Sequence, residues 1–595
     1  MNILLLFPPQ WTPISPYFAL PSLLGQLLAA GYSAKAVDLN IEFYNDILNK
    51  KNVESALIKA KESLPVLLKE ISKHHTPSKK AEEYPFEIQN MIAKYGIIKK
   101  FEATENVADL IDGAKEVLKT EKFYDPKLFT SALYTIDKAL EIISLPYAPS
   151  KLSFASYDNP FFKLNWESIK YWTFDANTNI FLDYFENKID KLLCDSPEYI
   201  GISINSSTQI VPGFTLAHLI KKRSSKAHLN IGGNFFGRVI ENVAPEFFEL
   251  FCDSILVEEG ERPAVELAKH IEGKLSIGEV SNLVYLKDGV VKTNGKATPP
   301  RLDEIAPVSL DGYNLESYFT PEIVMPHQTS KGCYWGKCSF CDQDFGQNFN
   351  IKNTDKLVLE LEELKNKYGI SSFEFIDESV APAYLEELAR KILDKGLSVD
   401  YFSNARLESA FTYDILKKAR ASGLRMLLWG LESGSLKIME LINKGIDLKK
   451  RFDILKDSSN ADIWNFAFIF FGFPAETRED AEATIDMLCK HSDIIDSYGR
   501  SVFTMGKHTK LKDMPQEYGI VSVMEQQDEL SPSLDFVGTG MGKAELSELI
   551  KQCTKSCAKA YSNPLWMYLR YREFLFLYIK KYGSKWVKVY NMEAE

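Results

Sequence analysis

Two series of short apolar segments, each alternating with helix-forming segments, constrain the fold of this 595-residue chain more than any other feature. The first series begins at residues 2–7 and the second at residues 323–327. Strands that alternate with helices form parallel sheets, because a crossover helix returns the chain to the same end of the sheet. The chain is also too long for one hydrophobic core. We therefore expect two to four domains, two of them α/β.

The first series predicts a doubly wound, Rossmann-like domain over residues 1–298. It is interrupted at about 41–195 by a polar, lysine-rich segment that we interpret as a helical insertion. Its expected strands are 2–7, 34–39, 199–204, 228–231 and 254–257, with a closing hairpin at 282–292. Ligands of such sheets bind at the carboxyl ends of the strands. The candidate ligand-binding residues there are Asn205, Ser206, Gly232, Gly233, Glu258 and Gly260.

The second series predicts a partial (β/α)6 barrel over residues 299–514, followed by a helical C-terminal domain over 515–595. A helix at 354–368 is expected to start at Thr354 as its N-cap. The site of such a barrel lies at the carboxyl ends of its strands. The expected strands are 323–327, 372–376, 399–403, 425–429, 463–470 and 501–505.

Three cysteines, Cys333, Cys338 and Cys341, follow the first expected strand of the second series. Three thiolates can hold a metal centre, but a four-iron cluster used only for electron transfer normally has four cysteine ligands. Three cysteines would therefore leave one iron open for chemistry. The structural alternative is a zinc site with His327 or Asp342 as the fourth ligand.

This arrangement resembles the radical S-adenosylmethionine (SAM) superfamily, and specifically its subgroup with an N-terminal cobalamin-binding domain. The resemblance covers roughly residues 1–40 and 196–510. It implies that the three cysteines ligate a [4Fe–4S] cluster whose fourth iron binds the methionine part of SAM. It also implies that the reduced cluster cleaves SAM to a 5′-deoxyadenosyl radical, and that methylcobalamin delivers a methyl group to an unactivated carbon.

Further matches to the family fall at the expected strand ends of the barrel. Gly430-Leu431-Glu432-Ser433-Gly434 is similar to the family's Gly-x-Glu-Ser-Gly segment, which binds ribose and amino groups. The cofactors carry the difficult chemistry in such enzymes, so the sequence nominates no catalytic acid or base. The SAM contacts that the resemblance implies are Asp377, Glu378, Ser403, Arg406, Glu432, Ser433 and Gly472.

One departure from the family pattern concerns the cysteine spacing. Four residues separate Cys333 from Cys338, whereas the family usually has three. Gly336 helps the loop to absorb the extra residue, because glycine adopts positive φ without steric cost. Peptide-maturation members resemble the Cys-Tyr-Trp-Gly start and carry longer spacings, so a peptide substrate is expected. A small secondary metabolite fits the sequence equally well.

The N-terminal domain resembles the cobalamin-binding domain but lacks the Asp-x-His-x-x-Gly motif that supplies an axial histidine in many cobalamin proteins. Radical members of the family commonly lack it too. The six candidate residues of this domain are therefore expected to bind cobalamin without a protein ligand to cobalt. The alternative is a domain that keeps the fold but has lost the cofactor.

Three other functions remain open. A radical SAM enzyme without methylation would carry out an epimerisation, a cyclisation or a rearrangement. A methylthiotransferase would need its own three cysteines in the N-terminal domain, and no such trio precedes Cys333. A zinc-stabilised binding module would be no enzyme.

Composition limits the partners and the compartment. A net charge of −11 argues against nucleic acid or anionic membrane as a partner. No apolar run reaches transmembrane length, and residues 1–9 lack the basic leader of a signal peptide. The five remaining cysteines are scattered and form no disulfide framework. We expect a cytoplasmic enzyme with a peptide or small-molecule substrate and an external electron donor of flavodoxin or ferredoxin type.

Overall fold

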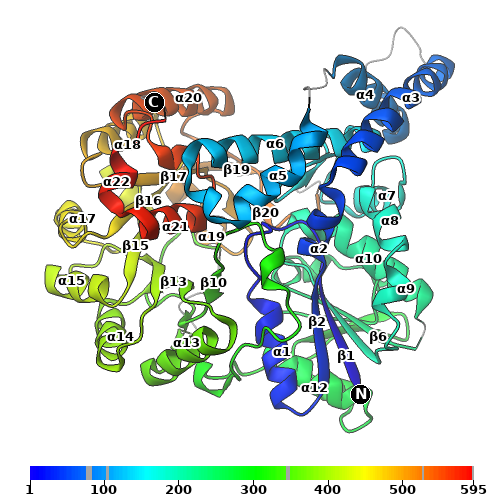
Figure 1. Ribbon diagram of the computed structural model, residues 1–595, viewed down its shortest axis with the longest axis horizontal. Helices are drawn as coiled ribbons and strands as arrows, with labels where there is room; N and C mark the ends of the chain where they lie inside the picture. The colour runs from blue at the N-terminus through cyan, green and yellow to red at the C-terminus, as the bar shows by residue number, and fades with distance from the viewer. Residues whose placement is uncertain (75–82, 102–105, 225, 343–348, 525–527, 593–595) are drawn as a thin grey trace. The chain divides into compact units, whose positions relative to one another are not determined.

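The computed structural model describes residues 1–74, 83–101, 106–224, 226–342, 349–524 and 528–592 (Figure 1). Two compact units divide the chain. The first unit comprises Met1–Thr298, Ala306–Pro321 and Gln527–Ser531. The barrel unit comprises Pro299–Ile305, Glu322–Gln526 and Pro532–Glu595. Residues after 532, for which the sequence predicted a separate domain, cluster with the barrel strands.

The first unit is built on a seven-stranded sheet of order β2-β1-β5-β6-β7-β8-β9. The first five of these strands pair in parallel, and the last two form an antiparallel hairpin, as the sequence predicted. The strands are β1 (Asn2–Phe7), β2 (Ser33–Asp38), β5 (Tyr199–Ser203), β6 (His228–Gly232), β7 (Ser254–Leu256), β8 (Leu283–Lys287) and β9 (Val290–Thr293).

Strand β1 is apolar on both faces because helices cover the sheet on both sides. Its alternate residues Ile3, Leu5 and Phe7 share one buried cluster with leucines of α1 (Ala19–Ala29) and α12 (Glu261–Ile271). The intervening Leu4 and Leu6 are buried as well. The α/β prediction for this unit is confirmed.

The insertion between β2 and β5 is largely helical, as predicted, apart from two short strands at 151–152 and 157–158. Its helix α5 (Val107–Lys119) packs on α6 along an apolar stripe whose other face meets solvent. No described helix in the chain is both long and apolar enough to cross a membrane. The remaining helices of the insertion are α2 (Leu39–Ile47), α3 (Lys50–His74), α4 (Phe86–Lys100), α6 (Pro126–Ser144), α7 (Trp166–Phe174), α8 (Ile180–Glu186) and α9 (Ile189–Leu192).

The barrel unit has six parallel strands whose spatial order, β10-β13-β14-β15-β16-β17, follows the chain. This order makes an open (β/α)6 barrel and confirms the prediction. Its strands are β10 (Val324–His327), β13 (Ser372–Val380), β14 (Asp400–Ala405), β15 (Leu424–Glu432), β16 (Trp464–Phe471) and β17 (Ser497–Val502). Its helices are α13 (Thr354–Tyr368), α14 (Pro382–Lys395), α15 (Tyr413–Ala421), α16 (Leu436–Leu441), α17 (Arg451–Asn460) and α18 (Arg478–Lys490).

Several boundaries differ from the prediction. Strands β13 and β15 continue to Val380 and Glu432 through irregular register, so residues expected in loops lie within strands. Strand β17 begins at Ser497, four residues earlier than expected. The N-cap of α13 is Asn353 and not Thr354, because the Asn353 side chain accepts the backbone N–H groups of the first helical turn.

The C-terminal residues were predicted to be helical, but they also contain the short strands β19 (Ile520–Val523), β20 (Ser533–Leu534) and β21 (Phe536–Gly538). Helix α21 (Arg572–Tyr582) is buried from Phe574 to Ile579, so the aromatic residues within that stretch form core. The Phe576 ring lies 5.2 Å from that of Phe402 on β14. This packing joins the C-terminal residues to the barrel.

Helix α20 (Lys543–Ala560) packs on α18 and brings together three cysteines that the sequence analysis treated as scattered. Cys553 and Cys557 are fully buried, and their sulfur atoms are 4.0 Å apart. Burial raises the pKa of the Cys489 thiol on α18, while a hydrogen bond with Cys557 acts to lower it. All three remain free thiols.

Candidate functional site

The cysteine loop, whose described part is residues 332–342, follows β10 and the short strand β11 (Ser330–Lys331). Strand β11 pairs with β12 (Asn350–Ile351), which closes the loop at its base. Cys333, Cys338 and Cys341 are not joined in disulfides and are half-buried. Gly336 has a φ of +57°, the positive φ that the sequence analysis expected a glycine to adopt there. The loop therefore presents three thiols at the carboxyl end of the barrel sheet.

The zinc alternative fits this loop poorly. Among the described residues, no three His, Cys, Asp or Glu side chains are grouped to hold one metal ion. Nε2 of His327 lies 3.0 Å from Oε2 of Glu360, and Oδ1 of Asp342 accepts the His508 N–H at 2.7 Å. Zinc needs ligands that converge on one ion, whereas each thiolate of a four-iron cluster binds a separate iron. The three thiols therefore suit a cluster better than zinc.

Two cations face the cysteine loop. Burial raises the pKa of the Cys338 thiol, while Lys444 and Arg406 act to lower it. The Lys444 ammonium forms a buried ion pair with Glu432 at 2.5 Å. Burial lowers the pKa of Lys444, but Glu432 and Cys338 raise it above its ordinary value. Each of the two cations is paired with a carboxylate, Lys444 with Glu432 and Arg406 with Glu408, so the loop faces ion pairs and not an unpaired positive charge.

Asp377, predicted to contact SAM, holds the chain where it enters the cysteine loop. Its Oδ1 accepts the backbone N–H groups of Thr329 and Ser330, both at 2.8 Å, and its Oδ2 accepts the Thr329 hydroxyl. Burial raises the pKa of Asp377 to about 6 despite these hydrogen bonds. The neighbouring Glu378 is exposed, since successive residues of a strand face opposite sides.

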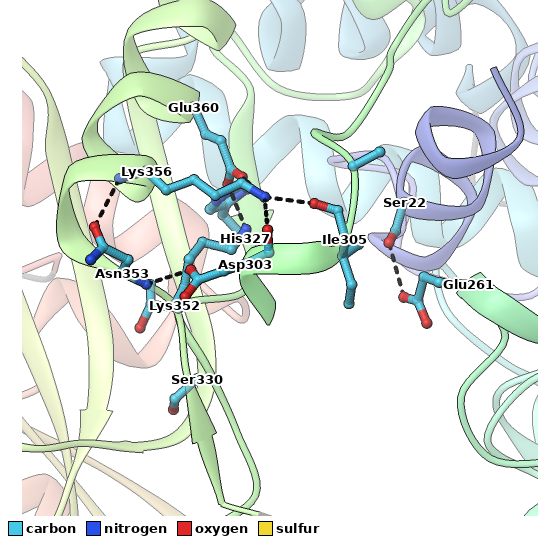
Figure 2. Close-up of polar contacts among 12 residues, drawn as sticks. Ser22, Glu261, Asp303, Ile305, His327, Ser330, Lys352, Asn353, Lys356 and Glu360 are labelled. Atoms are coloured by element: carbon cyan, nitrogen blue, oxygen red, sulfur yellow. Dashed lines mark hydrogen bonds and ion pairs between the residues drawn. The ribbon is translucent and has the colours of Figure 1, made fainter. Parts of the chain in front are cut away.

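Figure 2 shows a buried charge network at the base of the cysteine loop. Oε2 of Glu360 lies 3.0 Å from His327 Nε2, and it accepts a hydrogen bond from Lys352 Nζ at 2.5 Å. Lys356 donates to the carbonyl groups of Asp303 and Ile305, each at 2.8 Å. His327 ends β10 and Lys352 follows β12, so the network ties both ends of the loop to α13. This network was not predicted from the sequence.

Arg406, predicted to bind the SAM carboxylate, is buried and has partners within the protein. Its Nε donates to Glu408 at 2.8 Å and its Nη2 to the Lys444 carbonyl at 2.7 Å. Ser403 is fully buried and donates to the Asn404 carbonyl at 3.2 Å. Oδ1 of Asn404 is buried without a hydrogen-bond partner among the described residues. Asn404 is thus a candidate ligand contact that the sequence analysis did not single out.

Glu432 ends β15 with a φ of +62°, unusual for a residue other than glycine. Its carboxylate is held by Lys444, whereas Ser433 Oγ lies 3.1 Å from Thr484 Oγ1. Gly472 follows β16, and its N–H donates to the fully buried Glu476. Of the predicted SAM residues, Asp377, Arg406 and Glu432 lie near the cysteine loop through these contacts.

Replacing Glu476 by glutamine should remove a pH-dependent loss of stability. Burial raises the pKa of Glu476 to about 7, so the folded state favours the protonated acid. The stability that protonated Glu476 contributes is complete below the pKa of this side chain in the unfolded state. It is lost, by up to about 3 kcal/mol, as the pH rises through 7. Urea unfolding at pH 5 and pH 8 should show Glu476→Gln more stable than the wild type at pH 8 only. Glu482→Gln, at an exposed position of α18, is the control; an equal effect there would contradict the assignment.

The residues predicted to bind cobalamin lie at the carboxyl edge of the first unit's sheet. The Ile204 N–H donates to the Gly232 carbonyl at 2.8 Å, and the Asn234 N–H donates to Oδ1 of Asn205 at 3.2 Å. Gly233 has a φ of +106°, and a Cβ there would lie 2.2 Å from the Ile204 carbonyl oxygen. The structure therefore brings the turns after β5 and β6 into contact.

The other predicted cobalamin residues occupy the same edge. Ser206 caps a short turn through the Thr208 N–H at 3.3 Å. Glu258, at a φ of +59°, pairs with Lys296, and Gly260 precedes α12. None of the six lines the hollow of about 1130 Å³ that runs along β2.

Gln10, just after β1, is a further candidate at this edge. It is fully buried, and its Oε1 accepts the Tyr44 hydroxyl at 2.8 Å. Its Nε2 has no hydrogen-bond partner among the described residues. A buried amide with one unpaired donor favours a ligand at this position. The sequence analysis did not single out Gln10.

Comparisons with known proteins agree with this geometry. Residues 328–488 match the family model of the Radical SAM superfamily. The chain is 26% identical over 302 residues to an uncharacterized methyltransferase of Pyrococcus horikoshii, covering 49% of this chain and 63% of that protein. It is also 26% identical over 305 residues to the anaerobic magnesium-protoporphyrin IX monomethyl ester cyclase of Cereibacter sphaeroides, covering 48% of each. The chain thus spans less than two thirds of these relatives.

Two solved structures share the fold. One is the cobalamin-dependent S-adenosylmethionine radical enzyme OxsB with aqua-cobalamin bound, at a TM-score of 0.52 and 16% identity over 68% of this chain and 70% of that one. The other is the radical S-adenosylmethionine methyltransferase TsrM from Kitasatospora setae, with cobalamin and a [4Fe–4S] cluster bound. Its TM-score is 0.51 at 13% identity, over 88% of this chain and 81% of that one. Residues 328–488 are therefore a radical SAM domain, in a chain that shares the fold of cobalamin-dependent radical SAM enzymes.

Proposed function

We propose that this protein is a cobalamin-dependent radical SAM methyltransferase that acts on an unactivated carbon of a peptide or a secondary metabolite. The observation that carries the proposal is the cysteine loop. Its three thiols stand beside the buried Lys444–Glu432 pair at the carboxyl end of a (β/α)6 sheet. Cys333, Cys338 and Cys341 would hold the [4Fe–4S] cluster, with one iron left for SAM.

When bound, the cluster and SAM would supply a carbon radical, and cobalamin would supply the methyl group. The protein's own residues position and shield these groups. Lys444 and Arg406 lie beside Cys338 and act to lower the pKa of its thiol, which favours the thiolate that would bind iron. Glu432 and Asn404 Oδ1 offer acceptors to the amino or hydroxyl groups of SAM. Asp377 and the Glu360 network fix the two ends of the cysteine loop.

Cobalamin would bind at the carboxyl edge of the first unit's sheet. The turns containing Asn205, Ser206, Gly232 and Gly233 bring backbone close to a ligand there, and Gln10 Nε2 supplies a buried donor. Glu258 and Gly260 flank the same edge. We further infer a cytoplasmic enzyme with an external electron donor of flavodoxin or ferredoxin type.

A second candidate function is a radical reaction without methylation. The cyclase of Cereibacter sphaeroides, 26% identical to this chain, favours it. Both candidates need the cluster and SAM, so cluster content alone does not separate them. Methyl transfer additionally needs cobalamin in this chain.

Anaerobic reconstitution with iron, sulfide, cobalamin and SAM tests both candidates. We expect about four iron atoms per chain, bound cobalamin, and 5′-deoxyadenosine after reduction. If 5′-deoxyadenosine forms but cobalamin does not bind, the non-methylating candidate replaces the first. If the protein holds zinc without iron or sulfide, both candidates fail.

A further inference from the structure

Trp335, one of the four residues between Cys333 and Cys338, docks on the segment after α16. Its indole Nε1 donates to the Asn443 carbonyl at 2.9 Å. Its ring occupies the space where a Cβ of Gly445 would lie, only 2.0 Å from the nearest ring carbon. A glycine at 445 is therefore required for this contact, and the two positions fit each other although 110 residues separate them.

Arg406 covers the other part of the same ring. Its guanidinium lies 4.8 Å from the Trp335 ring centre and 5.7 Å from that of Tyr334. The hydrogen bonds of Arg406 to Glu408 and to the Lys444 carbonyl fix the guanidinium plane. A cation over an indole face at this distance stabilises by about 0.5–2 kcal/mol, more where solvent is excluded. Arg406 is 3% exposed, so the guanidinium side of this contact is shielded from water, whereas the Trp335 ring is half-buried.

Neighbouring residues of the cysteine loop dock on the same segment. The Asn443 side chain donates to the Lys337 carbonyl at 3.0 Å. The Ser339 N–H donates to the Ile442 carbonyl at 3.0 Å, and its hydroxyl to the Leu441 carbonyl at 2.7 Å. The stretch between Cys333 and Cys341 is thus anchored through its spacer residues.

We propose that Trp335 and Arg406 are positioning residues that hold Cys333 and Cys338 ready for the cluster across the widened four-residue spacing. The proposal rests on the proposed function for the identity of the group that the thiols receive. Tyr334 and Trp335 form the bulk of the longer spacer, and Arg406 clamps both rings to the barrel. The longer spacer thus supplies a side chain, Trp335, that docks on the barrel, and Arg406 contacts the cysteine loop and not SAM.

The first test uses the protein without iron and measures how fast iodoacetamide alkylates each cysteine, by mass spectrometry of the digested chain. Trp335→Ala should speed alkylation of Cys338 several-fold, with half-buried Cys489 as the internal reference. Arg406→Ala should speed it too, but less, because loss of the Arg406 charge also raises the pKa of the Cys338 thiol and so lowers its thiolate fraction. Trp335→Phe keeps a ring on Gly445 and under Arg406 and should restore much of the protection. Arg406→Lys should not, because lysine lacks the planar fork that bonds Glu408 and the Lys444 carbonyl together.

Arg425→Ala is the matched control, because Arg425 lies at the opposite end of the barrel strands and pairs with Asp400. Equal alkylation of Cys338 in the wild type, Trp335→Ala and Arg406→Ala would overturn the proposal. Equal acceleration in Arg425→Ala would overturn it too, because the effect would then reflect general loosening of the barrel.

The second test measures release of iron to a chelator after reconstitution. Loss of a residue that orients metal ligands commonly weakens metal binding 10- to 100-fold. We expect iron release about 10- to 100-fold faster in Trp335→Ala and Arg406→Ala, and unchanged in Arg425→Ala. If the wild type takes up no iron while the alkylation pattern holds, the proposed function fails and the positioning role stands. If iron binds and neither readout changes in the two variants, the positioning role fails alone.

Discussion

Replacing Cys338 by alanine is expected to abolish assembly of the iron–sulfur cluster and, with it, the formation of 5′-deoxyadenosine from SAM. Only three cysteines stand in the cysteine loop, and a four-iron cluster that also binds SAM needs a thiolate on each of its three other irons. Neither His327 nor Asp342 can substitute, because each is engaged by another partner. The measurements are iron and sulfide content, the absorption spectrum of the reconstituted protein, and chromatography of 5′-deoxyadenosine.

Cys489→Ala is the matched control for this variant. Cys489 is also half-buried and also lies in the barrel unit, but on α18 beside Cys557. It should keep wild-type iron content and product formation. Retention of both by Cys338→Ala would refute the assignment of the cysteine loop as the cluster site. Loss of both in Cys489→Ala would instead implicate the buried thiols of α18 and α20.

The strands and the cysteine loop could be predicted because each depends on residues close together in the sequence. Apolar runs such as residues 2–7 and 463–470 are buried on both faces of a parallel sheet, and such runs stand out from their surroundings. Strand ends were less well predicted. Asp377 and Glu432 belong to strands that continue past an irregularity in their pairing. Polar residues at these positions suggest a loop, so the sequence does not show that the strands continue.

The partners of the predicted site residues could not be read from the sequence. Arg406 was expected to face SAM, yet its guanidinium is fixed by Glu408, the Lys444 carbonyl and Trp335. Chemistry alone shows that arginine can bind a carboxylate, but not which acceptor the fold brings to it. The meeting of Cys489 with Cys553 and Cys557 likewise depends on the packing of α18 on α20.

Replacing Glu360 by alanine is expected to destabilise the barrel unit by about 3–5 kcal/mol, because it leaves a buried lysine without its counter-charge. Glu360 is 4% exposed, Lys352 6% and His327 0%. Burial acts to raise the pKa of Glu360, but His327 and Lys352 outweigh it and hold the carboxylate ionised. Burial also lowers the pKa of His327, so at pH 7 Lys352 supplies the positive charge. Urea unfolding at pH 7 measures the effect.

Two further variants separate the charge from the packing. Glu362→Ala removes a partly exposed partner of Lys395 from the same helix and should cost no more than about 1 kcal/mol. The double variant Glu360→Leu with Lys352→Met removes both charges and fills the space, so it should recover most of the stability. If the double variant is as unstable as Glu360→Ala, shape and not charge decides the effect.

Because His327 ends β10 and Lys352 follows β12, Glu360→Ala should also release both ends of the cysteine loop and speed alkylation of its thiols. A large loss of stability with unchanged alkylation would show that the network supports the barrel without positioning the loop.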